Sequence, residues 1–201
     1  MGNLSGSMAS MLASMPYAVA AKFAHPERPV VCTIGDGAFQ MLGMNEMITV
    51  KRHWREWADP RFIVLVLHNN DLTQVSWEMR EAGDPRWDTS QLLEDVNYAD
   101  YAELLGFTGI RVEDKSEVGP AWDAALRADK PVLIDVVTDA NMPPLPPHVT
   151  FEQAKGMAKA LLKGDPDVAR VIAETARSVA AEMLAKAKSV FSSDDGGDGR
   201  R

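Results

Sequence analysis

The sequence predicts an α/β fold in which a doubly wound, mainly parallel sheet carries helices on both faces. Two observations lead to this prediction. Short apolar runs rich in Val, Ile and Leu recur along the chain, at residues 30–34, 62–67, 108–112 and 132–137. Between these runs lie longer segments with helical periodicity. Strands that are joined through helices pair in parallel, so this alternation indicates a single parallel sheet.

The composition is that of an ordinary globular protein. The chain has 201 residues, of which 46% are hydrophobic and 25% charged, which is enough for one domain with a substantial core. The net charge of −8 disfavours a nucleic-acid partner or an anionic membrane surface. No apolar run reaches the roughly 18 residues of a spanning helix, and no signal-peptide pattern opens the chain. We therefore expect a soluble, cytoplasmic protein with no membrane span and no nucleic-acid partner.

The first helix is predicted between residues 7 and 24, where apolar side chains recur at steps of three and four. Pro16 falls inside this pattern and marks either a kink or the true start of the helix. We favour a loop to about Ser14 and a helix from Pro16, because proline suits the first turn. The strand at residues 30–34 should be fully buried, and its Cys32, the only cysteine, should be a reduced thiol.

Further helices are predicted between the strands. The helix after the first strand should bury Leu42, Met47 and Ile48 on one side, and a connecting loop should follow it at residues 53–60. Ser116 should cap the helix that precedes the last strand. These helices are predicted at residues 39–52, from near residue 73, at residues 98–105 with Gly106 as terminator, and at residues 116–128.

The chain changes character near residue 140. Prolines dominate residues 142–147, which predicts a stiff, extended connector. Two helices should follow at residues 150–163 and 166–189, the second with Asp165 as its cap and Pro166 as its first residue. We therefore divide the chain into a domain at residues 1–140, a connector with C-terminal helices at residues 141–190, and a disordered tail at residues 191–201.

Polar residues follow the first two predicted strands at the point where each strand ends. Residues 35–37 are Gly-Asp-Gly, and residues 68–71 are His-Asn-Asn-Asp. The carboxyl ends of parallel strands meet at one edge of a sheet, and ligands bind at that edge. We therefore expect the chemistry of this protein to lie where these two loops meet.

Each loop alone allows two interpretations. In the Gly-Asp-Gly turn, the glycines let the backbone approach an anion, and Asp36 can hold a magnesium ion against that anion. The same tripeptide is equally compatible with a tight turn in which Asp36 caps a helix, and Asn after a strand usually just makes a turn. The turn is not a dinucleotide fingerprint, because Gln40 replaces the third glycine, and no Gly-Lys-Ser/Thr of a P-loop follows.

Together, strand, Gly-Asp-Gly, helix, strand and Asn pair form the pattern of a thiamine diphosphate-binding motif. On these residues the sequence resembles the thiamine diphosphate-dependent 2-oxo acid decarboxylases and carboligases, in particular the pyruvate oxidase and acetolactate synthase branch. The resemblance covers about residues 3–165 and concerns only the C-terminal, diphosphate-binding domain of that family. Further segments that carry it are residues 4–22, 109–112, 131–137, 146–148 and 152–155.

The resemblance implies a magnesium and diphosphate site. Asp36 would supply a carboxylate oxygen to Mg²⁺, Asn69 its side-chain oxygen and Asp71 its backbone carbonyl. Asn70 is the competing ligand if the second strand runs one residue longer. His68 stands where the family has the first Asn of the pair, and both a tolerated replacement and a catalytic role are open for it. The diphosphate would be wrapped by Gly35, Asp36, Gly37 and Ala38.

The resemblance also assigns residues to the rest of the cofactor and to the substrate. Met11 matches the bulky residue that props the cofactor in its bent shape, and Ala9 would offer a backbone carbonyl to the aminopyrimidine. Val75 and Trp77 fall where the family lines its substrate pocket, although core packing explains Val75 equally well. No catalytic residue is identified within this chain.

The sequence also departs from the family pattern. The stretch between Asp36 and Asn69 is several residues longer than usual, with an insertion at residues 55–61, and Leu12 and Ser14 stand where members often have glycine. The family's other two domains have no counterpart here, and the domain looks short at its start. One of those domains binds the pyrimidine and carries the glutamate that activates the cofactor.

We therefore expect this chain to act on a small 2-oxo acid only with a chain that bears a pyrimidine-binding domain, or as a homo-oligomer. FAD would enter only through an absent domain. Two alternatives stay open: a catalytically inactive, truncated binding or regulatory module, and the beta chain of a split 2-oxo acid decarboxylase. The lone Cys32 argues against an iron–sulfur version, because clusters need several thiolates.

Overall fold

The computed structural model describes residues 10–142, 151–174, 176 and 177. Predictions for Ala9, for the prolines of residues 143–147 and for residues 178–201 lie outside the described residues. The chain divides into two compact units, Met1–Asp71 with Leu92–Asp139 and Leu72–Gln91 with Ala140–Arg201. No helix in the described part of the chain is long and apolar enough to cross a membrane.

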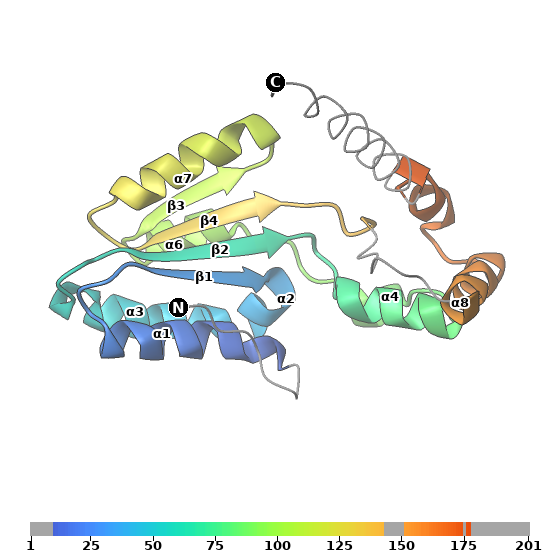
Figure 1. Cartoon of the computed structure of the whole chain (residues 1–201), viewed down its shortest axis with the longest axis horizontal. Helices are drawn as coiled ribbons and strands as arrows, with labels where there is room; N and C mark the ends of the chain where they lie inside the picture. Colours follow the sequence, from blue (N-terminus) through green and yellow to red (C-terminus); the bar gives the residue numbers. More distant parts are fainter. Residues whose placement is uncertain (1–9, 143–150, 175, 178–201) are drawn as a thin grey trace, which may run out of the picture. The chain divides into compact units, whose positions relative to one another are not determined.

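The first unit is built on a four-stranded sheet. Its strands are β1 (Val30–Gly35), β2 (Phe62–His68), β3 (Thr108–Val112) and β4 (Val132–Val137), in the spatial order β1-β2-β4-β3. All neighbouring strands pair in parallel, with Gly35 beside Leu67 and His68 beside Val137 in the register. The carboxyl ends of β1, β2 and β4 therefore lie at the same edge (Figure 1).

Helices cover both faces of this sheet (Figure 1). One face carries α1 (Ser14–Ala24), α3 (Met44–His53) and α6 (Tyr98–Leu104), and the other carries α7 (Val118–Arg127). Buried side chains of the first face include Met15, Phe39, Met47, Val50, Tyr98 and Phe107. On the second face Ala121 and Ala125 of α7 belong to a separate apolar cluster with residues of β2, β3 and β4. The predicted α/β, doubly wound fold is confirmed.

Strand β1 is less buried than predicted. Cys32 and Ile34 point into the core, but Val31 is 50% exposed and Thr33 is exposed as well. β1 pairs only with β2 among the described strands, so it is an edge strand covered on one face, and its burial alternates. Cys32 is a buried free thiol, as predicted, and burial raises its pKa to about 12.

The helix after β1 begins earlier than predicted. A single helical segment is formed by α2 (Asp36–Ala38), the π-helical turn η2 (Phe39–Gly43) and α3 (Met44–His53). A π turn contains one more residue than an α turn, so it rotates the residues that follow it. Met47 and Val50 are therefore fully buried, whereas Ile48, which was predicted to be in the core, is 56% exposed.

Close packing inside the π turn requires glycine at position 43. A Cβ atom on Gly43 would lie 2.3 Å from Cδ2 of Phe39, whose side chain is fully buried. The predicted loop at residues 53–60 is also more regular than expected, because the 3₁₀ turn η3 (Trp54–Glu56) follows α3 directly and Trp57 is buried.

Helix ends follow the sequence signals with one exception. α1 begins at Ser14 after a 3₁₀ turn (η1, Met11–Ala13), so Pro16 lies in its first turn. Gly106, at φ +85°, follows α6 as predicted. The prediction of Ser116 as a cap is wrong. Asp114 accepts a hydrogen bond from the backbone N–H of Ser116 (2.8 Å), and Glu117 accepts one from the N–H of Asp114 (3.1 Å), which is a capping box.

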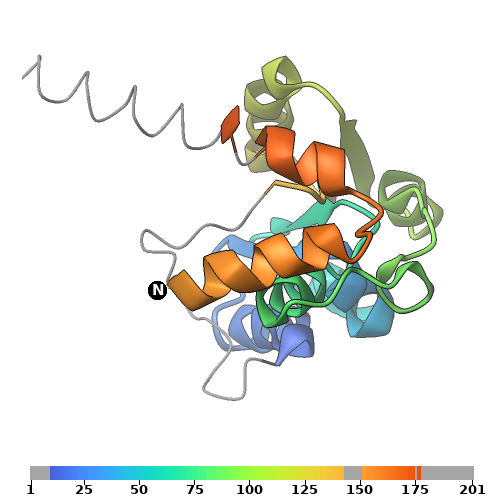
Figure 2. The same ribbon diagram turned by 90° about the vertical axis from the view of Figure 1, so that its right-hand side faces the viewer.

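The second unit is helical. It contains α4 (Thr73–Ala82), α5 (Asp88–Gln91), α8 (Phe151–Leu162) and a helical stretch at residues 168–174. α4 and α8 lie side by side (Figures 1 and 2). Residues 72–91, which the sequence analysis placed in the first domain, thus group with the C-terminal helices. Asp165 accepts a hydrogen bond from the backbone N–H of Asp167 (3.0 Å), which agrees with its predicted role as a cap.

Candidate functional site

The loops that follow β1 and β2 meet at the carboxyl edge of the sheet. Asp36 comes directly after β1, and residues 69–71 come directly after β2. The two loops meet at the carboxylate of Asp36. Oδ2 of Asp36 accepts hydrogen bonds from the backbone N–H groups of Asn69 (2.8 Å) and Asn70 (2.6 Å), and Oδ1 accepts one from the N–H of Gly37 (2.9 Å). The sequence-predicted loops are therefore brought together.

The carboxylate of Asp36 forms no ion pair with any cationic side chain that the structure describes. The residue is only 3% exposed, and none of the ion pairs found among the described residues involves it. Backbone N–H groups stabilise the negative charge of a carboxylate. They carry no full positive charge of their own, so the Asp36 carboxylate can still attract a cation.

The turn after β2 is held in an uncommon backbone shape. Asn70 has φ +57°, a left-handed conformation that Asn adopts more readily than most residues. The side-chain oxygen of Asn69 accepts a hydrogen bond from the N–H of Asp71 (3.0 Å). The carbonyl of Asn70 accepts one from Leu93 (2.9 Å), and Asp71 forms a β-bridge with Leu92. The turn is thus fixed from both sides.

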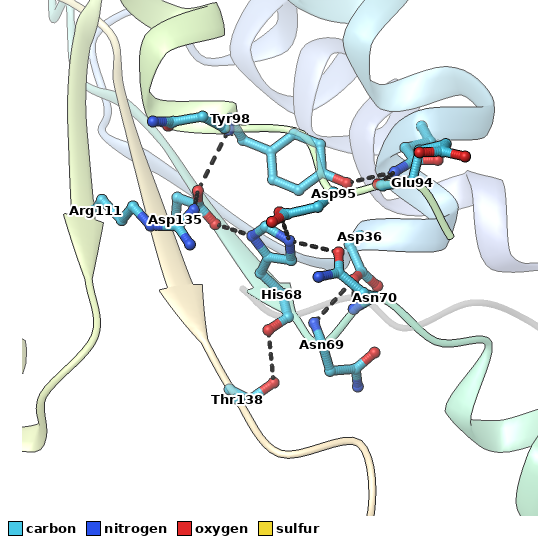
Figure 3. A network of polar contacts seen from close by, with 12 residues as sticks. Asp36, His68, Asn69, Asn70, Glu94, Asp95, Tyr98, Arg111, Asp135 and Thr138 are labelled. Atoms are coloured by element: carbon cyan, nitrogen blue, oxygen red, sulfur yellow. Dashed lines mark hydrogen bonds and ion pairs between the residues drawn. The ribbon is translucent and has the colours of Figure 1, made fainter. Parts of the chain in front are cut away.

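A second polar group lies next to this turn, centred on His68 (Figure 3). The imidazole is 2% exposed. Its Nδ1 lies 2.8 Å from Oδ1 of Asp135, and its Nε2 lies 2.7 Å from Oδ1 of Asn70 and 3.2 Å from Oδ1 of Asp95. Figure 3 shows the ring between Asp135 on one side and Asn70 on the other.

Asp135 is tied to the rest of the sheet. It lies in β4, is fully buried, and its Oδ2 accepts hydrogen bonds from Nη1 of Arg111 (2.9 Å) and from the backbone N–H of Tyr98 (3.3 Å). The Tyr98 ring stands at 4.8 Å from that of His68, centre to centre. Burial raises the pKa of Tyr98 to about 12, so its hydroxyl stays protonated, and it accepts a hydrogen bond from Gln40 (2.8 Å).

Comparison with known proteins identifies the family. Residues 2–136 match the family model described as "Thiamine pyrophosphate enzyme, C-terminal TPP binding domain". The chain belongs to this family of thiamine pyrophosphate (thiamine diphosphate) enzymes. The family resemblance inferred from the sequence is thereby confirmed.

Individual relatives agree with this result. YdaP of Bacillus subtilis (strain 168), provisionally named a thiamine pyrophosphate-containing protein, is 36% identical over 156 residues, which are 78% of this chain and 26% of that protein. The acetolactate synthase isozyme 2 large subunit of Escherichia coli (strain K12) is 33% identical over 145 residues, 71% of this chain and 25% of that subunit. The chain spans about a quarter of the length of these curated relatives.

The predicted diphosphate residues of this thiamine diphosphate-family chain share one place in the structure. Residues 35–38 and 69–71 lie within the same cluster around Asp36. Met11 lies in η1 and is 45% exposed, and Ala9 is outside the described residues. Val75 and Trp77 lie on α4 in the second unit, where Trp77 is buried and the Arg80 guanidinium lies 5.0 Å from the centre of its ring.

The ligand atoms available around Asp36 are all oxygens. In the described part of the chain no group of three or more His, Cys, Asp or Glu side chains could hold a metal ion. The set implied by the family is of another kind: one carboxylate, one carboxamide and one backbone carbonyl. Hard oxygen donors of this type are those that Mg²⁺ takes in proteins, with water and phosphate oxygens completing its shell. The residues present therefore fit magnesium chemically.

The position of β2 bears on which Asn is the ligand. β2 extends to His68, one residue further than predicted, and this is the condition under which Asn70 competes with Asn69. The side-chain oxygen of Asn70, however, lies 2.7 Å from Nε2 of His68. The side chain of Asn69 extends from its backbone away from the Asp36 carboxylate (Figure 3). The side-chain oxygen of Asn69 is engaged too, because it accepts a hydrogen bond from the N–H of Asp71 (3.0 Å). Both assignments therefore remain predictions.

Four polar residues behind the turn could not be recognised as a group from the sequence. Asp135, Tyr98, Arg111 and Asp95 were not predicted, although Asp135 interrupts an otherwise apolar strand, Val-Leu-Ile-Asp-Val-Val. A charged residue in the middle of a buried strand is rarely unpaired. That signal could have marked Asp135 as part of a polar group, but not its partners.

Proposed function

We propose that this chain is the thiamine diphosphate- and magnesium-binding domain of an enzyme that decarboxylates a small, pyruvate-like 2-oxo acid, as an oxidase or a carboligase. A pyrimidine-binding domain from elsewhere would complete its active site. The observation that carries the proposal is Asp36, a buried carboxylate that joins the two motif loops and has no cationic partner among the described residues. The family membership supports the cofactor.

In this proposal the Asp36 carboxylate holds Mg²⁺ together with the side-chain oxygen of Asn69 and the backbone carbonyl of Asp71. The helical segment that begins at Asp36 presents its positive dipole end, which favours a diphosphate, while the N–H of Gly37 holds Oδ1 of Asp36 in place. Magnesium reconciles these groups, because it lies between a carboxylate and the phosphate oxygens that would otherwise repel each other.

The chain's own residues bind and orient rather than transfer protons. Thiamine diphosphate, when bound, supplies the electron sink for loss of carbon dioxide from a 2-oxo acid. Tyr98, protonated at neutral pH, and His68, buried behind the turn, support the loop that holds the diphosphate. The group that activates the pyrimidine ring is assigned to the partner domain, and FAD, if present, to a third domain.

Calorimetry tests the proposal. Thiamine diphosphate with Mg²⁺ should raise the melting temperature strongly when the chain is combined with the pyrimidine-binding domain encoded beside it, and only weakly when the chain is alone. Tight binding by the isolated chain, or no binding in the combined sample, would contradict the proposal. The latter result, or the lack of any such neighbouring domain, would favour an inactive binding module. Asp59→Asn changes a carboxylate that lies just before the other end of β2, far along the strand from Asp36. As a control, it should show the same rise in melting temperature as the wild type.

A further inference from the structure

We propose that His68 is a positioning residue, which ties the turn at residues 69–71 to the interior of the sheet. It thereby keeps the magnesium–diphosphate clamp, the proposed ligands in residues 35–38 and 69–71, in the conformation that binds the cofactor. This inference rests on the proposed function. It concerns a residue that the sequence analysis left open between a tolerated replacement and a catalytic role, and it decides against both.

The contacts of His68 exclude direct catalysis. The side chain is 2% exposed, and both ring nitrogens already face polar partners, Asp135 at 2.8 Å and Asn70 at 2.7 Å. A carboxylate only accepts hydrogen bonds, so Nδ1 of His68 donates to Asp135. Nε2 then faces the carboxamide of Asn70, whose oxygen and nitrogen can each serve as its partner, and the carboxylate of Asp95 at 3.2 Å. No ring nitrogen is left for a substrate.

The contacts that link Arg111, Asp135, His68 and Asn70 form a tether between the sheet and the turn, and this tether begins deep in the sheet. Arg111 of β3 donates to Oδ2 of Asp135 at 2.9 Å, and Asp135 of β4 receives His68 of β2 on its other oxygen. Three neighbouring strands thus hold the imidazole. Because Asp135 is fully buried, its contacts are shielded from water and the ring has a fixed place.

The tether ends on the residue with the uncommon backbone. Asn70 has φ +57°, a conformation that costs a residue with a side chain about 1 kcal/mol or more. Its side chain is bound by His68, while its backbone N–H points at Oδ2 of Asp36, 2.6 Å away. Holding the side chain therefore helps to hold the N–H groups of residues 69 and 70 on Asp36, which is the arrangement that joins the two loops.

The imidazole is suited to this task because its two nitrogens lie on opposite sides of a rigid ring. It reaches Asp135 on one side and Asn70 on the other, in a nearly fixed geometry. The family resemblance places an Asn at position 68. Its side chain is shorter than that of His and ends in a single carboxamide group. The turn of this chain is therefore held by a longer link than an Asn can provide.

Amide hydrogen exchange measured by NMR on the full chain tests the tether directly. In His68→Asn, the amides of Asn69 and Asn70 should exchange at least about tenfold faster than in the wild type, while amides in the middle of β2 exchange at the wild-type rate. Asp59→Asn is the matched control, because it removes a hydrogen-bonded carboxylate beside the other end of β2. It should leave the amides of the turn unchanged. Unchanged exchange at Asn69 and Asn70 in His68→Asn would overturn the proposal.

A double-mutant cycle separates positioning from general destabilisation. The readout is the dissociation constant for thiamine diphosphate with Mg²⁺, obtained from amide shifts so that weak binding is still measured. His68→Asn should weaken binding about tenfold. Asn70→Gly keeps the left-handed turn but removes the side chain that His68 holds, so His68→Asn should have little further effect in that background. Fully additive effects would show that His68 acts through the fold in general and would overturn the proposal.

The two proposals fail in different ways. If wild type fails to bind thiamine diphosphate with Mg²⁺ even with the pyrimidine-binding domain, the proposed function falls, and the role of His68 in a clamp falls with it. If wild type binds and His68→Asn binds equally well with unchanged exchange, only the tether is wrong.

Discussion

Two buried aspartates of this chain differ in what balances their charge. Asp36 in the first unit and Asp165 in the second are each 3% exposed. Asp165 is paired with the guanidinium of Arg80, which contacts its two oxygens at 2.9 and 3.1 Å. Within the described part of the chain, the Asp36 carboxylate accepts hydrogen bonds from backbone N–H groups alone. Equal burial thus accompanies two different electrostatic situations, one closed within the protein and one open to a cation.

The difference separates a structural ion pair from the metal-ligand site that we propose at Asp36. A buried ion pair contributes little net stability, yet the loss of one partner leaves a charge without compensation. Asp165 needs Arg80 for this reason. Asp36 relies instead on backbone N–H groups, and no cationic side chain among the described residues pairs with it. The carboxylate of Asp165 is already paired with a cation, whereas that of Asp36 is available to the Mg²⁺ ion that we propose.

The largest effect is expected at Asp36. Asp36→Ala should abolish magnesium-dependent activity of the assembled enzyme, because it removes the carboxylate that we propose as a ligand of Mg²⁺. Activity is measured against Mg²⁺ concentration with the pyrimidine-binding domain present. Asp59→Asn should behave as the wild type. Unchanged activity of Asp36→Ala would remove the contrast with Asp165 and show that the metal site is misassigned.

The next effect is expected in the second unit. Arg80→Met should lower the free energy of unfolding of this unit by about 3–5 kcal/mol, because Asp165 is left buried and unpaired. Amide exchange of α4 with increasing urea measures this locally. Arg127→Met, which breaks an exposed pair with Asp123 at 3.9 Å, is the control and should change little. A small effect of Arg80→Met would mean that Asp165 does not depend on its guanidinium.

Acid should distinguish the two units further. Burial alone would raise the pKa of Asp165, but hydrogen bonds from Arg80 and from the backbone N–H groups of Arg86 and Asp167 outweigh it, so the pKa lies below its ordinary value of 3.8. A lowered pKa stabilises the folded state above 3.8, and this stability is lost as the pH falls through the folded-state pKa. Exchange of α4 amides should therefore accelerate only below about pH 4.

The Arg80→Met variant is the control for this pH dependence. Without the guanidinium the lowering is reduced, so exchange should accelerate at a higher pH than in the wild type. Identical pH profiles in the two proteins would contradict the assigned cause.

The smallest effect is expected at an exposed carboxylate. Asp114, like Asp36, accepts a hydrogen bond from a backbone N–H, but it lies in water, which already solvates its charge. Asp114→Ala should speed exchange at the start of α7 by only a few-fold through loss of the cap. Ser116→Ala should have no comparable effect. A larger effect of Ser116→Ala would reinstate the cap that the sequence suggested.

Local signals predicted most of the fold. Strands β3 and β4 were predicted with their observed bounds, because Gly106 and Pro131 stand just before them and apolar residues fill them. The π turn at Phe39–Gly43 was not predicted, since its extra residue shifts the apolar period without leaving a residue-type signal. The prediction that β1 is fully buried was wrong, because the sequence does not show which strand lies at an edge.

The candidate site could be predicted only in part from the sequence. The two loops were found because their residue types follow the strands directly. The tether of His68 was not, because Asp135 is 67 positions away in the chain and only the register of β2 with β4 brings the two together. Contacts of this kind depend on tertiary pairing, which no single segment encodes.

The π turn also limits how the length of this chain can vary. Surface loops usually tolerate the gain or loss of a residue, but the segment from Phe39 to Gly43 lies between the motif aspartate and the core positions Met47 and Val50. Deleting one residue there would restore an ordinary α-helix and turn both side chains by about 100° around its axis, away from the sheet. Insertions and deletions are therefore expected in relatives on either side of this segment and not within it.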